Sequence, residues 1–247
     1  MNFSKKLKFL INSNVKNESI VLQKLIDSFY NQNDIDYNIN SNDILVIIGG
    51  STHIYFEKRE KYCVLAVPHN SIDFTALIAV IEHVYSLIDN HFSIPDYWFY
   101  MHDTCMLGPS FFTLLKPYIH DLYINHYDMK PLTYSKSMNI GIYKYNFLLN
   151  DKSYFLELRS HNYPSMEEVQ YLKKKGVQIE DFAFQKQNSY HHSFTPCTMS
   201  DRIVNMEDKR IIYEKSTTLR ITEYFPILDF YKYKANWELK YIYDLNP

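Results

Sequence analysis

Short apolar segments that stop at polar or glycine-containing stretches most constrain the fold of this chain. The clearest is Ile44–Ile48 in DILVIIGGS, which is rich in β-branched residues and ends at Gly49-Gly50. Further apolar segments are LKFLI at 7–11, YCVLAV at 62–67 and YWFYM at 97–101. Continuous apolar runs of this length are typical of strands buried on both faces of a sheet.

Helical patterns separate these segments. Apolar residues recur at helical spacing in residues 19–32 and again in SIDFTALIAVIEHVYSLI, residues 71–88. The second segment is the clearest helix in the chain, with Ser71 placed to cap it and Asp73 in its first turn. The order strand, helix, strand, strand, helix, strand predicts an α/β fold with a mainly parallel sheet flanked by helices.

The pattern is less regular after Pro109. SFFTLLKPYI predicts a short helix or turn that ends at Pro117, and residues 135–149 predict a polar loop leading into a helix. Residues 164–176 carry a capping box and a glycine stop, and residues 209–237 mix strand-like alternation with an aromatic tail. We expect a single domain over 1–247, with one half at about 1–110 and a less regular half at about 111–247.

The polar residues that follow the apolar segments are predicted to lie along one edge of the sheet. Right-handed crossovers place the carboxyl ends of parallel strands on one side, and ligands bind beyond those ends. The stretches expected there are Asn12–Asn14, Gly49–Ser51, His69–Asn70 and His102-Asp103.

His102 and Asp103 are the first candidates for chemistry at this edge. A carboxylate at a strand end suits Mg²⁺ or Mn²⁺, which take oxygen ligands and share them with substrate phosphates. His102 would orient that carboxylate or contact a phosphate. The alternative is that Asp103 caps the following turn and His102 is a core histidine; the gathering of strand ends favours the functional interpretation.

Two other stretches on this edge have both a functional and a structural interpretation. The helix start at Asn70–Asp73 offers free N–H groups to an anion, although Asp73 is equally explained by the helix dipole. Gly49-Gly50-Ser51 permits a sharp turn or a close approach to a ligand. It is not a dinucleotide-binding fingerprint, and no P-loop lysine follows.

Histidine and cysteine residues elsewhere give weaker signals. At most one of His191 and His192 is expected to be a metal or phosphate ligand, because adjacent residues in an extended segment point in opposite directions. Cys105 lies three residues from His102, as a nucleophile beside its base would, but a buried inert cysteine explains it better.

Composition bounds the class of protein. The net charge of −2 gives no electrostatic case for a nucleic-acid partner. Three cysteines, at 63, 105 and 197, suggest free thiols, and no stretch approaches the roughly 20 apolar residues of a membrane span. We expect a soluble cytoplasmic protein. The abundance of Asn, Ile, Lys and Tyr fits an A/T-rich genome, bacterial or from a large DNA virus.

The order of the segments resembles the nucleotide-sugar half of GT-A glycosyltransferases. LKFLINSN, DILVIIGGS, YCVLAVPHNSIDFTALIAVIEH and YWFYMHDTCMLGPSFF follow the order of that family's strands, long helix and acidic Asp-x-Asp strand end. SMNIGIYKYNFLL is similar to the acceptor-side segment after the acidic motif. The resemblance covers about residues 5–150 and implies a GT-A-like, Rossmann-like fold.

The resemblance implies a nucleotide-diphosphate sugar as donor and Mn²⁺ or Mg²⁺ on its diphosphate. It places donor contacts at Ser13, Asn14, Gly49, Gly50, Ser51, Asn70, Asp73 and His102. Where the family has two carboxylates, this chain has His102-Asp103-Thr104. Asp103 is therefore the one matching carboxylate, and the expected metal ligands are Asp103, His102 and His191.

The reaction implied is transfer of the sugar to a glycan, lipid or protein acceptor. The cation and the helix start would neutralise the departing diphosphate. An inverting enzyme would use a carboxylate to take the acceptor proton. The candidates, which we leave unranked, are Glu157, Glu167, Glu168 and Asp181.

Two alternatives stay open. The first is a metal-dependent hydrolase in which His69, His102 and Asp103 ligate zinc, with His53 or His191 completing the site. The second is a non-catalytic protein of glycosyltransferase-like fold that binds a nucleotide or glycan or has a structural role.

Overall fold

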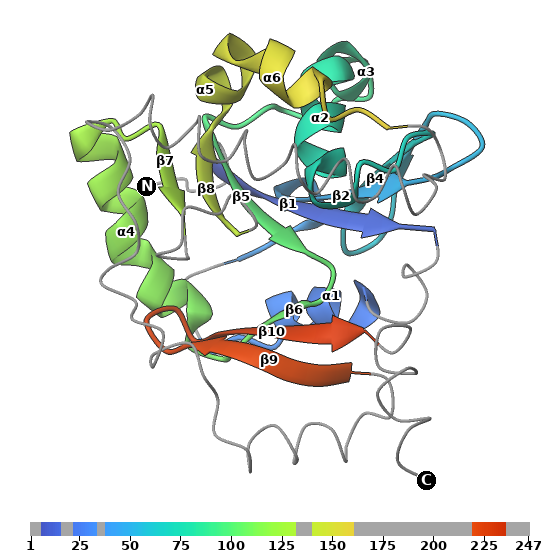
Figure 1. Ribbon diagram of the computed structural model, residues 1–247. Helices are drawn as coiled ribbons and strands as arrows, with labels where there is room; N and C mark the ends of the chain where they lie inside the picture. Colours follow the sequence, from blue (N-terminus) through green and yellow to red (C-terminus); the bar gives the residue numbers. More distant parts are fainter. Residues whose placement is uncertain (1–5, 16–21, 34–37, 132–139, 161–218, 236–247) are drawn as a thin grey trace, which may run out of the picture. The chain divides into compact units, whose positions relative to one another are not determined.

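The computed structural model of the chain describes residues 6–15, 22–33, 38–131, 140–160 and 219–235 (Figure 1). These residues form two compact units that alternate along the chain. The first unit holds described residues 6–15, 39–102, 119–131 and 140–160. The second holds 22–33, 103–118 and 219–235, with residue 38.

The first unit is built on a seven-stranded mixed sheet in the order β3-β4-β2-β1-β5-β8-β7. Its four central strands are parallel to one another: β4 (Cys63–Val67), β2 (Ile44–Gly49), β1 (Leu7–Asn14) and β5 (Tyr97–His102). The three outer strands pair antiparallel to their neighbours: β3 (Tyr55–Lys58) at one edge, β8 (Gly141–Lys144) beside β5, and β7 (Met129–Pro131) at the other edge. The predicted α/β fold with a mainly parallel sheet is confirmed.

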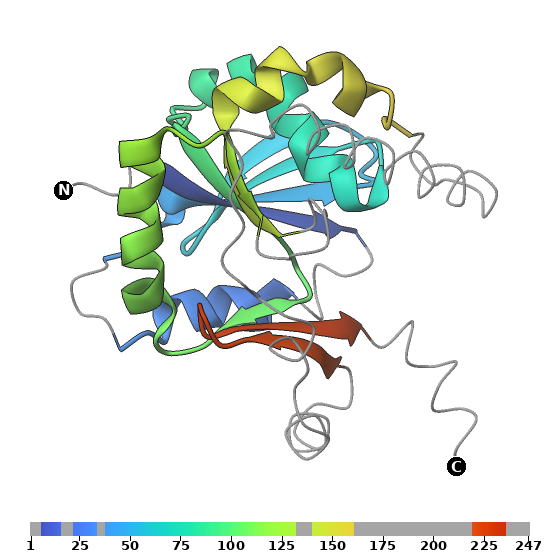
Figure 2. The same ribbon diagram turned by 60° about the vertical axis from the view of Figure 1, so that its left-hand side comes forward.

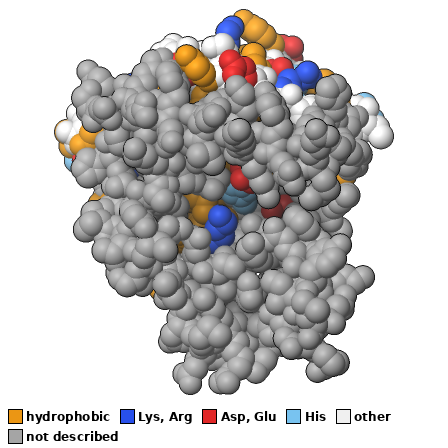
Figure 3. All heavy atoms as spheres, in the orientation of Figure 1, with side chains coloured by type: hydrophobic (Ala, Val, Ile, Leu, Met, Phe, Trp, Pro, Cys, Tyr) orange, Lys and Arg blue, Asp and Glu red, His pale blue; other side chains and the backbone are white. Residues whose placement is uncertain are grey.

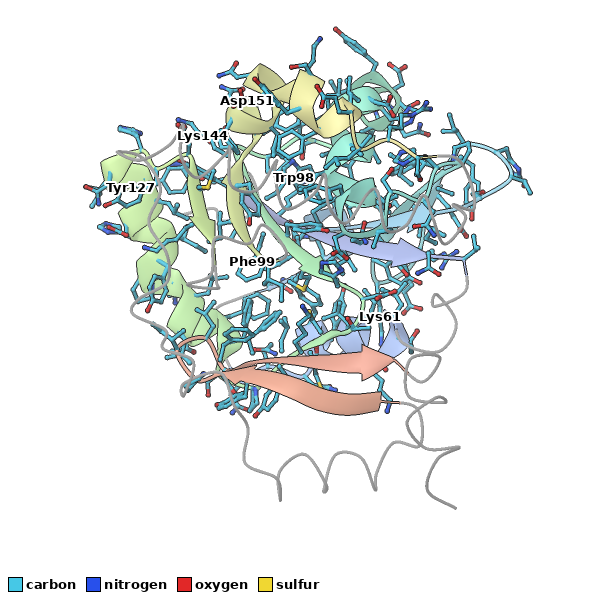
Figure 4. All side chains as sticks on the ribbon, in the orientation of Figure 1. Lys61, Trp98, Phe99, Tyr127, Lys144 and Asp151 are labelled. Atoms are coloured by element: carbon cyan, nitrogen blue, oxygen red, sulfur yellow. The ribbon has the colours of Figure 1, made fainter. Side chains whose placement is uncertain are left out.

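Burial explains why the central strands are apolar. Every residue of β2 and β4 is buried, as is β1 up to Ser13. Trp98 and Phe99 are both fully buried on opposite faces of β5 (Figure 4). Trp98 stacks on Phe92 at 6.2 Å between ring centroids, and Phe99 meets Phe9 of β1 at 5.8 Å. A strand packed on both faces needs no polar alternation.

Four helices cover one face of this sheet in both ribbon views (Figures 1 and 2). They are α2 (Thr75–Glu82), α3 (Val84–Asp89), α5 (Tyr145–Asn150) and α6 (Lys152–Leu156). Buried residues of all four join the core that includes Leu10, Ile47 and Trp98. On the outer surface of α3, α5 and α6, exposed apolar and charged side chains are interspersed (Figure 3).

The predicted helix over 71–88 is interrupted. It begins as a 3-10 turn, η3 (Ile72–Phe74), continues as α2, and breaks at His83 before α3. Ser71 does not cap it, because its hydroxyl makes no capping hydrogen bond. The apolar periodicity therefore predicted the helical segment but not its breaks, which depend on partners elsewhere in the unit.

The helix predicted to end at Pro117 does not end there. Helix α4 spans Phe111–Asn125 with Pro117 inside it. A proline removes one backbone hydrogen bond from a helix. Leu115 and Ile119, on either side of it, are buried, and we attribute the continuation to their packing. The sequence did not predict edge strand β3, because its second half lies in the polar EKREK stretch at 57–61.

The remaining helical elements described are helix α1 (Leu22–Tyr30) and a 3-10 turn, η2 (Ser41–Asp43).

The second unit contains a three-stranded antiparallel sheet in the order β6-β10-β9. Its strands are β6 (Cys105–Leu107), β9 (Leu219–Phe225) and β10 (Phe230–Ala235). The strand-like alternation in residues 209–237 is confirmed for the part described. The Leu107 N–H donates to the Ser28 hydroxyl of α1 at 3.0 Å, which joins helix and sheet.

The β9–β10 turn is fixed by one carboxylate. Asp229, at φ 50°, accepts hydrogen bonds from the Ser110 N–H at 3.0 Å and the Tyr224 hydroxyl at 3.2 Å. Its carbonyl accepts from the Gly108 N–H at 2.6 Å. A Cβ at position 108 would lie 2.1 Å from the Asp229 side chain, so this approach requires glycine. None of the helices in the described part of the chain is long and apolar enough to cross a membrane.

Lys8 is a buried charged side chain in the central strand of the first unit. Lys8 of β1 is 2% exposed, donates to the Ser93 hydroxyl at 2.8 Å and lies 4.1 Å above the Phe92 ring. Burial lowers the pKa of Lys8 to about 8, although Asp43 opposes the change. The unfolded chain retains this proton to a higher pH.

We predict that stability rises between pH 8 and pH 10.5 because of Lys8. In that interval the unfolded state binds more protons than the folded state, so the free energy of unfolding increases with pH, by up to about 3 kcal/mol. Lys8→Met should remove this rise and stabilise the protein at pH 7.5 by roughly 1–3 kcal/mol. Urea denaturation of wild type and Lys8→Met at pH 7.5 and pH 10.5 measures both effects. A Lys8→Met variant less stable than wild type at pH 7.5 would contradict the prediction.

Candidate functional site

The direction of strand addition in the first unit reverses at β1. The chain passes from β1 to β2 and β4 on one side, then returns to β5 on the other side of β1. The carboxyl ends are in register, with Asn12 beside His102 and Asn14 beside Gly49. Open α/β sheets bind ligands beyond the strand ends at such a reversal. The candidate site is therefore the carboxyl edge between β1 and β5, which we call the switch edge.

Asn12 connects β1 to the start of the helix that follows β4. Its Nδ2 donates to the Ile72 carbonyl at 2.9 Å, and its Oδ1 accepts from the Ala76 N–H at 2.9 Å. The Ala76 N–H is one of the four at the start of α2 that have no partner within the helix. Asn12 of strand β1 therefore caps helix α2, which is the role that the sequence suggested for Ser71.

The turn that Asn12 holds has an unusual backbone. Ile72 has φ 53°, in the left-handed region, which is a genuine outlier for a β-branched residue. Its N–H donates to Asn70 Oδ1 at 3.3 Å, and its carbonyl also accepts from the Thr75 hydroxyl at 3.2 Å. Backbone strain of this kind costs about 1–3 kcal/mol and persists only where surrounding contacts fix it.

Asp73 and His102 face each other across the switch edge. The Asp73 carbonyl accepts the hydroxyl of Tyr100, which fixes the residue against β5. Asp73 Oδ1 lies 3.8 Å from His102 Nδ1, with the two side chains 44% and 13% exposed. This distance allows an ion pair when the imidazole is protonated but not a direct hydrogen bond. A partly exposed carboxylate and an imidazole are thus placed together, but the carboxylate is Asp73 of the helix start, whereas the strand-end argument paired His102 with Asp103.

The glycine turn after β2 is committed to packing. The Gly50 N–H donates to the His69 carbonyl at 3.1 Å, and the Ser51 N–H donates to the Val67 carbonyl at 3.0 Å. Gly50 has φ 80°, which favours glycine. A Cβ on Gly49 would lie 2.8 Å from Thr75 Cγ2 and 3.0 Å from the His69 oxygen. These glycines bring the ends of β2 and β4 close to α2, and their contact with a donor stays a prediction.

His69 is the centre of a buried network beside this turn. Its Nδ1 lies 3.1 Å from the Ser71 hydroxyl, which accepts the Ser160 N–H at 2.9 Å, while the Ser160 hydroxyl donates to the Asn70 carbonyl at 2.5 Å. Glu82 Oε2 is 3.9 Å from His69 Nε2, beyond hydrogen-bond distance, and accepts instead from Arg159 at 3.1 Å. The network anchors the chain after α6 to the β4–η3 loop.

This serine, histidine and glutamate have the order of a hydrolytic relay but not its access. His69 and Ser71 are each only 2% exposed, so no substrate carbonyl reaches the hydroxyl. Burial lowers the pKa of His69 to about 4, and the positive charge of Arg159 acts in the same direction. His69 is therefore neutral near pH 7 and serves the packing of this loop.

The other predicted site residues have different positions. Ser13 is buried on the face of β1 opposite Asn12, whereas Asn14 is partly exposed at the strand end. Asp103 is 4% exposed. Among the described residues, no group of three or more His, Cys, Asp or Glu side chains is placed to hold a metal ion. The metal assignment to Asp103, His102 and His191 stays a prediction, and His191 lies outside the described residues.

The remaining candidates divide in the same way. Cys105 is fully buried, which fits the inert interpretation, and His53 is exposed beside Tyr55. Glu157, at the end of α6, is exposed, while Glu167, Glu168 and Asp181 lie outside the described residues. Sequence reasoning missed the roles of Asn12, Tyr100 and Ser160, because their partners are 60, 27 and 89 residues away along the chain.

Comparison with known proteins gives structural neighbours only. No protein-family model matches the sequence, and a search of curated proteins gives no significant match. Among solved structures, the chain is similar to S. aureus TarS residues 1–349, at 12% identity and TM-score 0.44, covering 76% of this chain and 58% of that one. The same protein in complex with UDP has 10% identity and a TM-score of 0.44, covering 77% of this chain and 58% of that one. Its complex with UDP-GlcNAc has 12% identity and a TM-score of 0.42, covering 70% of this chain and 54% of that one. This chain therefore spans less than two thirds of each of these three structures.

Gly49→Ala should destabilise the protein by about 1–3 kcal/mol, because the added methyl group meets Thr75 and an immobile backbone oxygen. Thr75→Ser removes the clashing methyl group but keeps the hydroxyl, so the double variant should regain part of the loss. Urea denaturation of both single variants and the double variant measures the coupling. Wild-type stability of Gly49→Ala would show that this close approach is absent.

The neutral state of His69 predicts a loss of stability in acid. Between about pH 6.5 and pH 4 the unfolded chain binds a proton at His69 that the folded protein does not. The free energy of unfolding should therefore fall as pH falls through this interval, by up to about 3 kcal/mol. His69→Asn retains an amide for Ser71 and cannot titrate, so its curve should be flatter than that of the exposed-site control His91→Asn. Parallel curves for these two variants would contradict the assignment.

Proposed function

We propose that the chain is a glycosyltransferase that binds a nucleotide-diphosphate sugar at the switch edge. The observation that carries the proposal is the meeting of Asn12, Asp73, Tyr100 and His102 at the reversal point of a mainly parallel sheet. Sheets of this kind bind nucleotides beyond their carboxyl ends. The partly exposed Asp73 carboxylate and the mostly buried His102 imidazole supply the polar groups that orient such a ligand.

The chemistry requires neutralisation of a leaving diphosphate. The bond between the anomeric carbon and the diphosphate oxygen breaks, and the acceptor oxygen forms the new bond while its proton passes to a base. The imidazole of His102 can donate a hydrogen bond to the developing charge.

A divalent cation is part of the proposal. An exposed carboxylate and an imidazole at one edge suit Mn²⁺, which accepts oxygen and nitrogen ligands, and Mg²⁺ is commonly held by one or two carboxylates together with substrate phosphates. We propose Asp103 and His102 as ligands, together with His191, which lies outside the described residues. When bound, the cation would supply positive charge to the diphosphate.

The geometry does not favour the hydrolase alternative. His69, one of its three predicted zinc ligands, is 2% exposed and has its Nδ1 beside Ser71. To share a zinc ion with His102, His69 would need a ring nitrogen directed toward His102, but its Nδ1 lies beside Ser71 and its Nε2 lies 3.9 Å from Glu82 Oε2. The non-catalytic alternative differs from the transferase only in turnover, so it is separated by activity rather than by structure.

The test is stabilisation by donors. Melting temperature is measured with UDP-glucose, UDP-N-acetylglucosamine, GDP-mannose and CMP-sialic acid, each with and without Mn²⁺. A ligand present at 100 times its Kd should raise the free energy of unfolding by about 2.7 kcal/mol. We expect one nucleotide class to raise the melting temperature, more strongly with Mn²⁺. Stabilisation by Zn²⁺ alone would support the hydrolase, and no response to any donor would contradict the proposal.

Variants locate the binding to the switch edge. Asp103→Asn should reduce the Mn²⁺-dependent part of donor binding in calorimetry, and Asp73→Asn should weaken donor binding with or without Mn²⁺. Asp96→Asn is the matched control, because this exposed carboxylate precedes the amino end of the same strand β5. Unchanged binding by Asp103→Asn would remove that residue from the metal site, and equal losses in Asp96→Asn would show a non-specific effect of charge.

A further inference from the structure

Asn12 has a position in the site that hydrogen bonding alone does not explain. Its side chain is 8% exposed at the end of the central strand, and both halves of its amide are used, one as donor and one as acceptor. A carboxylate of the same shape cannot donate, and leucine of similar size can do neither. The two bonds reach the carbonyl of the left-handed Ile72 itself and the N–H of Ala76 four residues later, so the amide links the strained turn to the start of α2.

The turn determines where Asp73 lies. Asp73 follows Ile72 directly, and its carboxylate is 3.8 Å from His102 Nδ1. If Ile72 relaxed to an ordinary negative φ, the chain after it would change direction. Asp73 would then keep neither its carbonyl bond to Tyr100 nor its place opposite His102. The contacts on Ile72 made by Asn70 and Thr75 come from the same loop. Asn12 bonds Ile72 itself from the sheet that carries His102, whereas the Tyr100 hydroxyl of the same sheet bonds the next residue, Asp73.

We propose that Asn12 is a positioning residue, which sets Asp73 against His102 by holding Ile72 in the left-handed conformation, and so prepares the switch edge for the donor diphosphate. This inference rests on the proposed function for its ligand but not for its geometry. The strain at Ile72 is then the cost of presenting an exposed carboxylate at the reversal point of the sheet.

The test separates positioning from simple stabilisation. Asn12→Leu removes both hydrogen bonds at nearly constant size. Asn40→Ala is the matched control, because Asn40 is a second asparagine with two side-chain hydrogen bonds, which cap η2 before the amino end of β2. Both variants should lose stability in urea denaturation. Asn12→Leu alone should weaken binding of the stabilising nucleotide-sugar, by about tenfold in calorimetry, which is what one lost polar interaction costs.

Relief of strain gives a second readout. Glycine adopts positive φ without cost, so Ile72→Gly added to Asn12→Leu should restore stability. It should not restore affinity, because a glycine turn without Asn12 is free to leave the bound conformation. Recovery of stability and affinity together would overturn the proposal, and so would equal donor binding by Asn12→Leu and Asn40→Ala.

A ligand-free measurement distinguishes this proposal from the function on which it rests. In labelled protein, a nuclear Overhauser effect between the Asp73 β protons and the His102 ring should be present in wild type and in Asn40→Ala, and lost in Asn12→Leu. If no nucleotide-sugar binds wild type, the proposed function fails, and this signal still decides the role of Asn12. Its persistence in Asn12→Leu would overturn that role. If Asn12→Leu does not fold, Asn12→Asp, which retains only the acceptor to Ala76, replaces it with the same expected losses.

Discussion

The parallel pairing of β1 with strands on both sides is the constraint on which the first unit depends. β1 is bonded to β2 and to β5 in the same direction, and its apolar residues are fully excluded from water. Once this register is formed, Asn12 lies beside His102 whatever the loops do. The hydrophobic burial that stabilises the sheet therefore also fixes the relative height of the two strand ends that carry polar side chains.

The polar contacts at the strand ends have a different function from the core. Buried polar groups contribute little net free energy when paired, but cost much more when left unpaired. Asn12, Tyr100 and Ser160 each reach a backbone group of the β4–η3–α2 segment from a different part of the chain. They thus specify one conformation of that segment, including the strained Ile72. A strained backbone conformation that surrounding contacts hold in place is typical of ligand-binding sites.

The sequence predicted the central sheet because burial on both faces leaves a simple signature. Ile44–Ile48 and Cys63–Val67 have no polar positions, and their observed strands match those segments closely. Edge strand β3 was missed because an exposed edge tolerates Glu57 and Lys58, which read as loop residues. The continuation of α4 through Pro117 was missed because local propensity does not register packing on either side of the proline.

At the site, the sequence predicted which stretches gather but not how they bond. The meeting of His102 with the Asn70–Asp73 stretch followed from strand order alone. Ser71 was expected to cap the helix, yet that cap comes from Asn12, 64 residues from Ala76. Pairings at such separations depend on the register of strands and have no local signal.

Donor binding at the switch edge is measured most directly by mapping backbone amide chemical shifts in labelled protein during titration with the nucleoside diphosphate of the stabilising donor. We predict that the largest changes fall on residues 12–14, 70–73 and 102–103, at the carboxyl ends of β1, β4 and β5. Changes concentrated instead at the amino ends of the same strands, around Lys8, Ile44 and Asp96, would contradict it.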